Sequence, residues 1–379
     1  MGNGPRISLR SSVLLVVVLT LALSACDWPM FRYGPARTGF NPSETRLGIG
    51  NVGQLREVWS ADLGTGSVAQ HASAAVVGRT VYMGGSDGLL HVLDAASGAL
   101  LWTGVGQPLV GLGPDLSSPS VTAGTVFAGS GTAGQVNAWD AAGTIGCSGT
   151  PKTCQPLSSF FANGSFPSSP VDVNGVLYAA ATGDFLYAAN ALNGLEMWRA
   201  YIGGTSSSPA VAGGVAYVGA RDHRLWAFDA AGSNGCGGVP KSCVPLWTAT
   251  TGAPVDSSPA VANGVVYVGS QDNKLYAFDA SGQTGCTGVP KTCRPLWTAT
   301  TGAQVDSSPA VANGVVYVAS DRLYAYDAAG SIGCSGTPKT CTPLLGAPLP
   351  IRTLSSPTVA NGRVYVGALD NHLHAFALP

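Results

Sequence analysis

The chain repeats one sequence unit along its whole length. The run Ser-Ser-Pro-Ala-Val-Ala-Asn-Gly-Val-Val-Tyr-Val occurs twice, at Ser257–Val268 and Ser307–Val318. Positions equivalent to its proline recur at intervals of 39 to 51 residues: Ala74, Pro119, Pro170, Pro209, Pro259, Pro309 and Pro357. A period of this length is typical of propellers and other repeat arrays, in which each unit is a supersecondary element that stacks on its neighbours. The sequence therefore contains seven copies of one structural unit.

Each unit has the pattern of a four-stranded antiparallel meander. In the fifth unit the expected strands are Ser257–Val261, Val265–Ser270, Leu275–Asp279 and Leu296–Ala299. Asn263-Gly264 separates the first two, and this dipeptide favours a hairpin turn with positive φ. The strands are apolar runs with little alternation, so both of their faces should be buried. The sequence predicts an all-β fold, a seven-bladed β-propeller, or eight blades if residues 27–54 form a degenerate unit.

A tryptophan occupies the expected fourth strand of most units. The residues are Trp59, Trp102, Trp198, Trp247 and Trp297, with Leu345 and the stretch around Phe160 in the remaining places. Trp139 and Trp226 lie on third strands instead. We expect these rings to pack between blades; the alternative is an exposed aromatic row that stacks a sugar or a base. Because the chain ends after the third strand of the seventh unit, Leu55–Asp62 should close the ring as that blade's outer strand.

Charged residues are scarce and balanced. They make up 10% of the chain, and the formal net charge is −1. Such a surface has neither the basic footprint of a nucleic-acid-binding protein nor a basic stripe for anionic lipid. We expect no nucleic-acid partner.

The first 25 residues have the features of a secretory signal. Arg6 and Arg10 precede the apolar run Val13–Leu23, and Leu23-Ser24-Ala25-Cys26 follows. The run is shorter than the roughly 20 residues that span a bilayer. Leu-Ser-Ala-Cys resembles a bacterial lipobox, which implies that Cys26 is the acylated first residue of the mature chain. An ordinary signal peptide with a nearby cysteine is the alternative. On this basis residues 1–25 are a lipoprotein signal peptide, 26–54 a lipidated segment and linker, and 55–379 the propeller.

The other eight cysteines form four pairs that share one motif. The pairs are Cys147/Cys154, Cys236/Cys243, Cys286/Cys293 and Cys334/Cys341, and each loop reads Cys-x-Gly-x-Pro-Lys-(Thr/Ser)-Cys. Four copies of one short loop favour local disulfides over the 105 possible connectivities of eight cysteines. Zinc is the competing interpretation, but a structural site needs four ligands together, and these pairs lie in different units without a histidine. An exported chain would permit the disulfides.

Several segments resemble one family of repeat proteins. Leu93-Asp94-Ala95-Ala96-Ser97-Gly98 through Trp102 is similar to the tryptophan-docking repeat of the pyrroloquinoline-quinone (PQQ) enzyme propellers, and Asn190–Trp198 is a looser copy. Trp28-Pro29-Met30-Phe31, with Arg37-Thr38-Gly39 and Pro42, resembles the opening segment of many PQQ-like repeat proteins. The cysteine loops resemble those of exported bacterial members. The resemblance covers essentially residues 27–379 and implies the propeller fold.

Two functions are compatible with this resemblance. One is a non-catalytic lipoprotein scaffold, similar in kind to the BamB lipoproteins of outer-membrane assembly. The other is a PQQ-dependent dehydrogenase of alcohols, sugars or polyols, which would hold PQQ and Ca²⁺ on the propeller axis. The chain has no adjacent cysteine pair, no Cys-x-x-Cys-His, and only three glutamates, Glu44, Glu57 and Glu196, none at an assignable calcium-ligand position. The sequence therefore favours the scaffold, with no cofactor and no catalytic residue.

A few acids and histidines are candidates for a binding site. Asp256 and Asp306 precede Ser-Ser-Pro at equivalent positions, and Asp115 lies near that position in the second unit. They could line the channel as a cation or polyol site, although capping of the Ser-Ser-Pro turn is the simpler expectation. His372 and His374 alternate on a strand and could share a metal, but no third ligand is evident, so no metal site is predicted.

The sequence thus predicts a monomeric propeller in a bacterial cell envelope. It would be lipid-anchored to a membrane, would face the extracytoplasmic side, and would bind an envelope protein or a cell-wall polymer.

Overall fold

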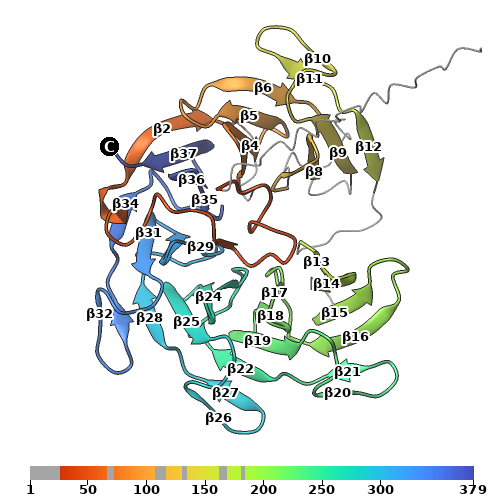
Figure 1. Ribbon diagram of the computed structural model, residues 1–379, viewed down its shortest axis with the longest axis vertical. Helices are drawn as coiled ribbons and strands as arrows, with labels where there is room; N and C mark the ends of the chain where they lie inside the picture. The colour runs from red at the N-terminus through yellow and green to blue at the C-terminus, as the bar shows by residue number, and fades with distance from the viewer. Residues whose placement is uncertain (1–25, 66–71, 107–116, 130–134, 162–168, 181–183) are drawn as a thin grey trace, which may run out of the picture.

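The protein is a ring of seven β-sheets. The computed structural model describes residues 26–65, 72–106, 117–129, 135–161, 169–180 and 184–379. The sheets follow one another around the ring in chain order (Figure 1), which confirms the all-β propeller. Residues 27–54 add no further sheet to the described part; they supply β1 (Phe40–Asn41), which pairs parallel with the sixth sheet, and the short helix η1 (Val52–Gln54).

Each sheet is a meander of four strands, counted here from the channel outward. The first strands are β3 (Ala75–Val77), β7 (Ser120–Thr122), β13 (Val171–Val173), β17 (Ala210–Ala212), β23 (Ala260–Ala262), β29 (Ala310–Ala312) and β35 (Thr358–Ala360). The second strands are β4 (Thr80–Gly84), β8 (Thr125–Gly129), β14 (Val176–Ala180), β18 (Val215–Ala220), β24 (Val265–Ser270), β30 (Val315–Ala319) and β36 (Arg363–Gly367).

The outer half of each sheet follows the same order. The third strands are β5 (Leu90–Asp94), β9 (Gln135–Asp140), β15 (Phe185–Asn190), β19 (Arg224–Asp229), β25 (Lys274–Asp279), β31 (Arg322–Asp327) and β37 (His372–Ala377). The fourth strands are β6 (Leu100–Gly104), β12 (Ser158–Phe161), β16 (Glu196–Tyr201), β22 (Trp247–Thr250), β28 (Trp297–Thr300), β34 (Leu345–Pro348) and β2 (Arg56–Asp62).

The two faces of the ring carry different connections. Turns such as Asn263-Gly264, with φ of 50° and 78°, join first to second strands, and the third-to-fourth connections lie at the same end of each sheet. We call this side the turn face. The Ser-Ser-Pro segments and the second-to-third turns lie at the opposite end, which we call the serine face.

The N-terminal strand closes the ring. β2 pairs antiparallel with β37, from Arg56 opposite Ala377 to Asp62 opposite His372, and is the outermost strand of the seventh sheet. The first and last parts of the propeller are therefore joined by a ladder of backbone hydrogen bonds, in the place expected from Trp59.

Four disulfide-bonded hairpins extend the sheets. The disulfides join Cys147 to Cys154, Cys236 to Cys243, Cys286 to Cys293 and Cys334 to Cys341, as the motif predicts. The hairpin strands are β10 (Cys147–Ser148) with β11 (Thr153–Cys154), β20 (Cys236–Gly237) with β21 (Ser242–Cys243), β26 (Cys286–Thr287) with β27 (Lys291–Cys293), and β32 (Cys334–Ser335) with β33 (Thr340–Cys341). Each second hairpin strand pairs parallel with the fourth strand of the preceding blade, as β27 does with β22. The loop of one blade thus holds the edge of its neighbour, which the sequence did not indicate.

The tryptophans pack between blades. Trp247 lies against Gly282 of the next blade, where an added Cβ would stand 2.2 Å from the ring. Its Nε1 donates to the Ala280 carbonyl at 3.3 Å, and the Tyr217 hydroxyl donates to the same oxygen at 2.8 Å. Trp139, Trp198, Trp247 and Trp297 are almost completely buried. These rings form the inter-blade core and not an exposed row for stacking.

Candidate functional site: the channel and its mouth

The N-terminal segment fills the centre of the ring. Residues 28–41 cross the channel (Figure 1) and hydrogen-bond to the middle valine of the first strand in six blades. The bonds run from the amides of Val76, Val121, Val211, Val261 and Val311 to the carbonyls of Trp28, Pro29, Ala36, Thr38 and Gly39, and from the Asn41 side chain to the Val359 carbonyl. This segment therefore satisfies backbone groups that a channel-lining strand would otherwise leave exposed.

Arg32 stands at the core of this segment. Its side chain is 3% exposed, and its guanidinium donates to the carbonyl of Ser258 at 2.7 Å, to that of Pro259, and to that of Pro309 at 3.3 Å. In the described part of the chain its partners are carbonyl oxygens and not carboxylates. Burial, and then the charge of Arg37, lowers the pKa of Arg32 to about 9. The cation thus joins the segment to the fifth and sixth blades.

Little space remains beside Arg32. A cavity lined by Trp28, Arg32, Ser308 and Ser356, among others, holds about one water molecule. The described residues beside Arg32 therefore leave no space for a larger ligand at this point of the channel.

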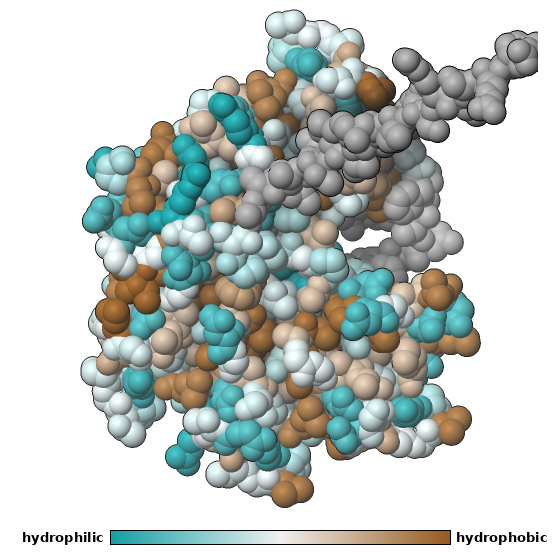
Figure 2. Space-filling view, in the orientation of Figure 1, coloured by the Kyte–Doolittle hydropathy of each residue, from teal (hydrophilic) through white to brown (hydrophobic). Residues whose placement is uncertain are grey.

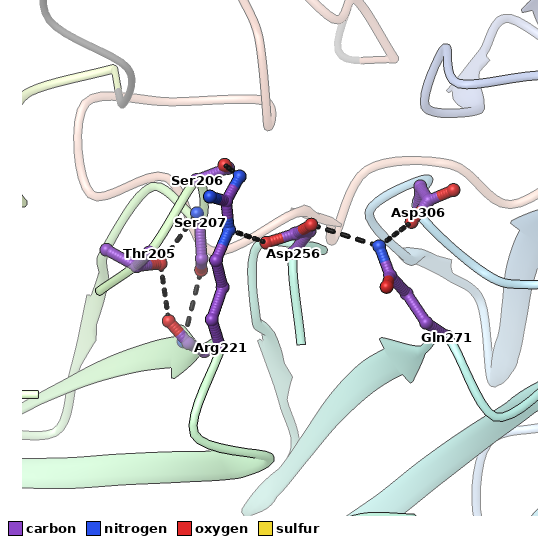
Figure 3. Close-up of polar contacts among 8 residues, drawn as sticks. Thr205, Ser206, Ser207, Arg221, Asp256, Gln271 and Asp306 are labelled. Carbon is purple, nitrogen blue, oxygen red and sulfur yellow. Dashed lines mark hydrogen bonds and ion pairs between the residues drawn. The ribbon is translucent and has the colours of Figure 1, made fainter. Parts of the chain in front are cut away.

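A chain of polar side chains links neighbouring blades on the serine face (Figure 3). Arg221 donates to Ser206 Oγ at 2.7 Å and to Asp256 Oδ1 at 3.3 Å. The Gln271 amide donates to Asp256 Oδ2 at 3.0 Å and to Asp306 Oδ1 at 2.9 Å, so it bridges the two carboxylates.

The chain of polar contacts ends at Arg352, which pairs with Asp306. The network therefore runs from the fourth blade to the connection that leads into the seventh. The two carboxylates are mostly buried, at 20% and 14% exposure, whereas the Arg221 side chain is 61% exposed. Donors already engage both acids, and the Arg221 guanidinium is the most exposed group of the network.

The structure places the sequence candidates as follows. Asp256 and Asp306 come together through Gln271, and their hydrogen bonds run to side chains, not to the Ser-Ser-Pro backbone that they were expected to cap. Asp115 and the signal segment 1–25 lie outside the described residues. Cys26 is a half-buried free thiol whose Sγ–H donates to the Ser43 carbonyl at 2.9 Å. Burial, reinforced by Glu44, raises the pKa of this thiol.

His374 bridges two carboxylates within the seventh blade. Its Nδ1 lies 2.9 Å from Glu57 Oε1 on β2, and its Nε2 lies 3.1 Å from Asp370 Oδ2. The His372 ring is 6.2 Å away, centroid to centroid. Among the described residues, no group of three histidines, cysteines or acids is arranged to hold a metal ion. His374 instead links the closing strand to the blade that it completes.

The turn aspartates bond to aromatic donors on third strands. Asp222 accepts from Trp226 Nε1 at 3.2 Å, Asp321 accepts from the Tyr324 hydroxyl at 3.1 Å, and Asp87 and Asp272 make the equivalent contacts. Burial raises the pKa of the Asp222 carboxyl. These acids thus fix the second-to-third turns.

Sequence reasoning missed a ring of serines. At six junctions the serine before the Ser-Ser-Pro proline, or before Ala74 in the first unit, accepts through Oγ the amide of the equivalent serine in the preceding blade. The six links run from Ser169 to Ser208, Ser208 to Ser258, Ser258 to Ser308, Ser308 to Ser356, Ser356 to Ser73 and Ser73 to Ser118, five of them at 2.9 Å and the first at 2.8 Å. The recurrence of this serine was the available signal, but its partner lies a whole unit away.

The first serine of the segment works within its own blade. Ser257 Oγ donates to the Gly269 carbonyl at 3.0 Å and accepts from the Gly269 amide at 2.7 Å. The two serines therefore have different roles. The first serine fixes the start of a blade to its own second strand, and the second serine fixes it to the neighbouring blade.

No helix in the described residues is both long and apolar enough to cross a bilayer.

Comparisons with known proteins agree with this architecture. The sequence model of the family described as "Outer membrane protein assembly factor BamB" matches residues 51–143, 134–234, 241–285 and 289–378. No curated protein matches the chain.

Solved structures share the fold at low identity. The quinohemoprotein alcohol dehydrogenase from Comamonas testosteroni is 13% identical, with a TM-score of 0.53 over 93% of this chain and 80% of that one. The quinohemoprotein alcohol dehydrogenase ADHIIG from Pseudomonas putida HK5 is 14% identical, with a TM-score of 0.52 over the same shares. The computationally designed Ika8 protein is 14% identical, with a TM-score of 0.55 over 83% of this chain and 99% of that one. Such likenesses show the fold alone.

Proposed function

Because the chain belongs to the family of the outer membrane protein assembly factor BamB, we propose that it is a non-catalytic scaffold of the cell envelope. Acylated Cys26 attaches it to a membrane, and the propeller binds an envelope protein on the extracytoplasmic side. The four disulfides fit an oxidising compartment outside the cytoplasm. The lipobox-like Leu-Ser-Ala-Cys sequence supports the anchor.

The packed channel carries this proposal. Residues 28–41 and the Arg32 guanidinium occupy the axis, where the resemblance to the PQQ enzymes would put the quinone and Ca²⁺. A tricyclic quinone needs a slot the size of its rings, and the cavity beside Arg32 holds about one water. Calcium needs six to eight converging oxygens, whereas donors already engage Asp256 and Asp306. The described residues beside Arg32 therefore leave no room for this cofactor.

The serine face offers a surface for a partner. Arg221 and Arg352 present partly exposed guanidinium groups at the channel mouth, with 61% and 37% exposure. Guanidinium groups bind carboxylates through paired hydrogen bonds. A partner segment that carries acidic side chains could thus replace the internal bonds of the network.

A binding experiment with matched variants tests the scaffold. The full chain with a C-terminal tag is cross-linked in membranes and purified, and co-purifying proteins are quantified by mass spectrometry. Arg221→Ala combined with Arg352→Ala should reduce recovery of the enriched envelope protein. Arg79→Ala, which removes a side chain 85% exposed on the turn face, should leave recovery unchanged.

Calorimetric titration with PQQ plus Ca²⁺, beside a dye-linked dehydrogenase assay, tests the other function. We expect neither binding heat nor turnover. Tight binding with turnover would overturn the scaffold proposal. If the protein is retained on isolated cell wall and no envelope protein is enriched, the partner is a polymer and not a protein.

A further inference from the structure

Exposed large apolar side chains gather on one face of the propeller. Fourteen such side chains are exposed among the described residues. All except Tyr201 and Ile351 lie in third-to-fourth connections or in the first half of a fourth strand, which places them at the turn-face end of the sheets. Figure 2 shows apolar side chains spaced along the rim of the ring. The turn face therefore offers several separate apolar contacts among the described residues.

The hairpin tips are the most prominent of these sites. β27 runs parallel to β22, which starts at the turn face, so the residues just before Lys291 project at the rim of that face. Val239 and Val289 occupy equivalent tips, and each is 102% exposed. The hairpin lysines are engaged elsewhere: Lys291 Nζ donates to the Gly282 carbonyl at 3.0 Å. These two tips therefore present apolar side chains without a cluster of free charge, whereas the other two hairpins carry Thr150 and Thr337 at the same position.

Cys26 lies on the same face and is tied to it directly. The next residue, Asp27, is 6% exposed and accepts from the Gly78 amide at 2.9 Å and from the Asn361 side chain at 3.3 Å. Gly78 and Asn361 belong to the first-to-second turns of the first and seventh blades. Within the described chain, therefore, no slack segment separates Cys26 from the folded body.

We propose that the turn face rests on the lipid bilayer, with Cys26 near its centre and the apolar tips at Val239 and Val289 on its rim. This deepens the proposed function and rests on its membrane anchor. Side chains such as Val239 and Val289 would enter the boundary of headgroups and acyl chains and add to the binding that the acyl chains supply. The serine face, with the Arg221–Asp256 pair, would then point away from the membrane and stay open to a partner.

Hydroxyl-radical footprinting of the full-length protein tests this orientation. The protein is oxidised in phosphatidylethanolamine–phosphatidylglycerol vesicles and in detergent. The turn-face probes are Val239, Val289 and Leu192, and the internal controls are Tyr201 and Ile351 on the serine face. In vesicles, oxidation of the turn-face probes should fall several-fold relative to the controls. Val239→Asp with Val289→Asp should restore oxidation at Leu192, whereas Ile351→Asp should not.

The outcomes distinguish the orientation of the propeller on the membrane from the acylation of Cys26. The intact mass of the Cys26 peptide reports acylation independently of the footprint. Acylated Cys26 with equal oxidation of both faces would overturn the orientation and leave the scaffold standing. Protection of the turn face without acylation would support the orientation and overturn the Cys26 anchor. Protection that appears only after envelope proteins are added would show that a protein, not lipid, covers this face, and would overturn the proposal.

Discussion

The backbone amide of Ser258 donates to the Oγ of Ser308 at 2.9 Å, across the boundary between the fifth and sixth blades. Both residues are buried, with 4% and 5% exposure. The bond fixes the start of one blade to the start of the next at the channel wall. Since five further junctions carry the same bond, the inner radius of the ring is set by a repeated hydrogen bond as well as by apolar packing.

Removal of one hydroxyl from this ring should destabilise the propeller. Ser308→Ala leaves the Ser258 amide buried without its acceptor, which costs about 1–3 kcal/mol. Urea unfolding followed by fluorescence measures this loss. Ser331→Ala, in an exposed third-to-fourth connection, is the control and should stay within about 0.5 kcal/mol of the parent. Equal stability of the two variants would contradict the structural role of the ring.

A pair of glycines separates backbone strain from steric clash. Gly264 has a φ of +78° and open space around it, whereas Gly282 has a φ of +64° and faces Trp247 at 2.2 Å from an added Cβ. Gly264→Ala should cost about 1–2 kcal/mol for the left-handed conformation. Gly282→Ala should cost about 1–3 kcal/mol more because the tryptophan must move. Thermal unfolding of both variants checks this order, and a reversed order would refute the docking of Trp247.

Opening one hairpin should expose the edge of the preceding blade. The Thr298 amide donates to the Lys339 carbonyl at 3.0 Å in the hairpin of Cys334 and Cys341. Replacing both cysteines with serine should speed hydrogen exchange at Thr298. Thr103, whose amide donates to Lys152 in an intact hairpin, is the control and should not change. The global loss should not exceed about 2.5 kcal/mol for a ring of this size; unchanged exchange at Thr298 would show that the hairpin stays in place without its disulfide.

Alkaline pH should destabilise the fold through buried tyrosines. Burial raises the pKa of Tyr82 and of Tyr217 to about 12. Between pH 10 and 12 the unfolded chain loses these protons and the folded protein keeps them, so stability falls as pH rises through this window. The lowered pKa of Arg32 acts in the opposite direction. The contribution of Tyr82 alone is therefore measured by comparing the pH dependence of stability in the parent protein and in Tyr82→Phe.

Urea unfolding midpoints at pH 8 and pH 11 measure the effect. The fall should be smaller in Tyr82→Phe, which also loses the hydrogen bond to the Ala141 carbonyl at pH 8. An identical fall in both proteins would show that Tyr82 ionises in the folded state as readily as in the unfolded chain.

Local sequence signals were enough to predict the blade. The expected strand Val265–Ser270 coincides with β24, and Leu275–Asp279 differs from β25 by one residue. Apolar runs and the Asn-Gly turn determine the local backbone within a few residues, so the strands and turns that they form can be predicted from the sequence. Trp59 likewise marked the closing strand because its equivalents fell at the same place in other units.

Contacts between units were beyond such reasoning. Arg32 donates to carbonyls of residues more than 220 positions away, and no feature of the sequence around Arg32 predicts these bonds. The link between Asp256 and Asp306 depends on Gln271, a turn residue without a distinctive pattern. The cysteine spacing predicted each disulfide, but the parallel pairing of β27 with β22 depends on how neighbouring sheets stack.

The position of the hairpins bears on how such a chain could lengthen or shorten over evolutionary time. The hairpin of one blade pairs with the outer strand of the blade before it, as β33 does with β28. A duplicated gene segment would therefore encode the hairpin that pairs with the unit preceding it. The serine link recurs at six of the junctions between units, so a newly inserted copy would find matching partners on both sides. Duplication would then require no coordinated change in the older units, and the near-identity of the fifth and sixth units is what a recent event of this kind would leave behind.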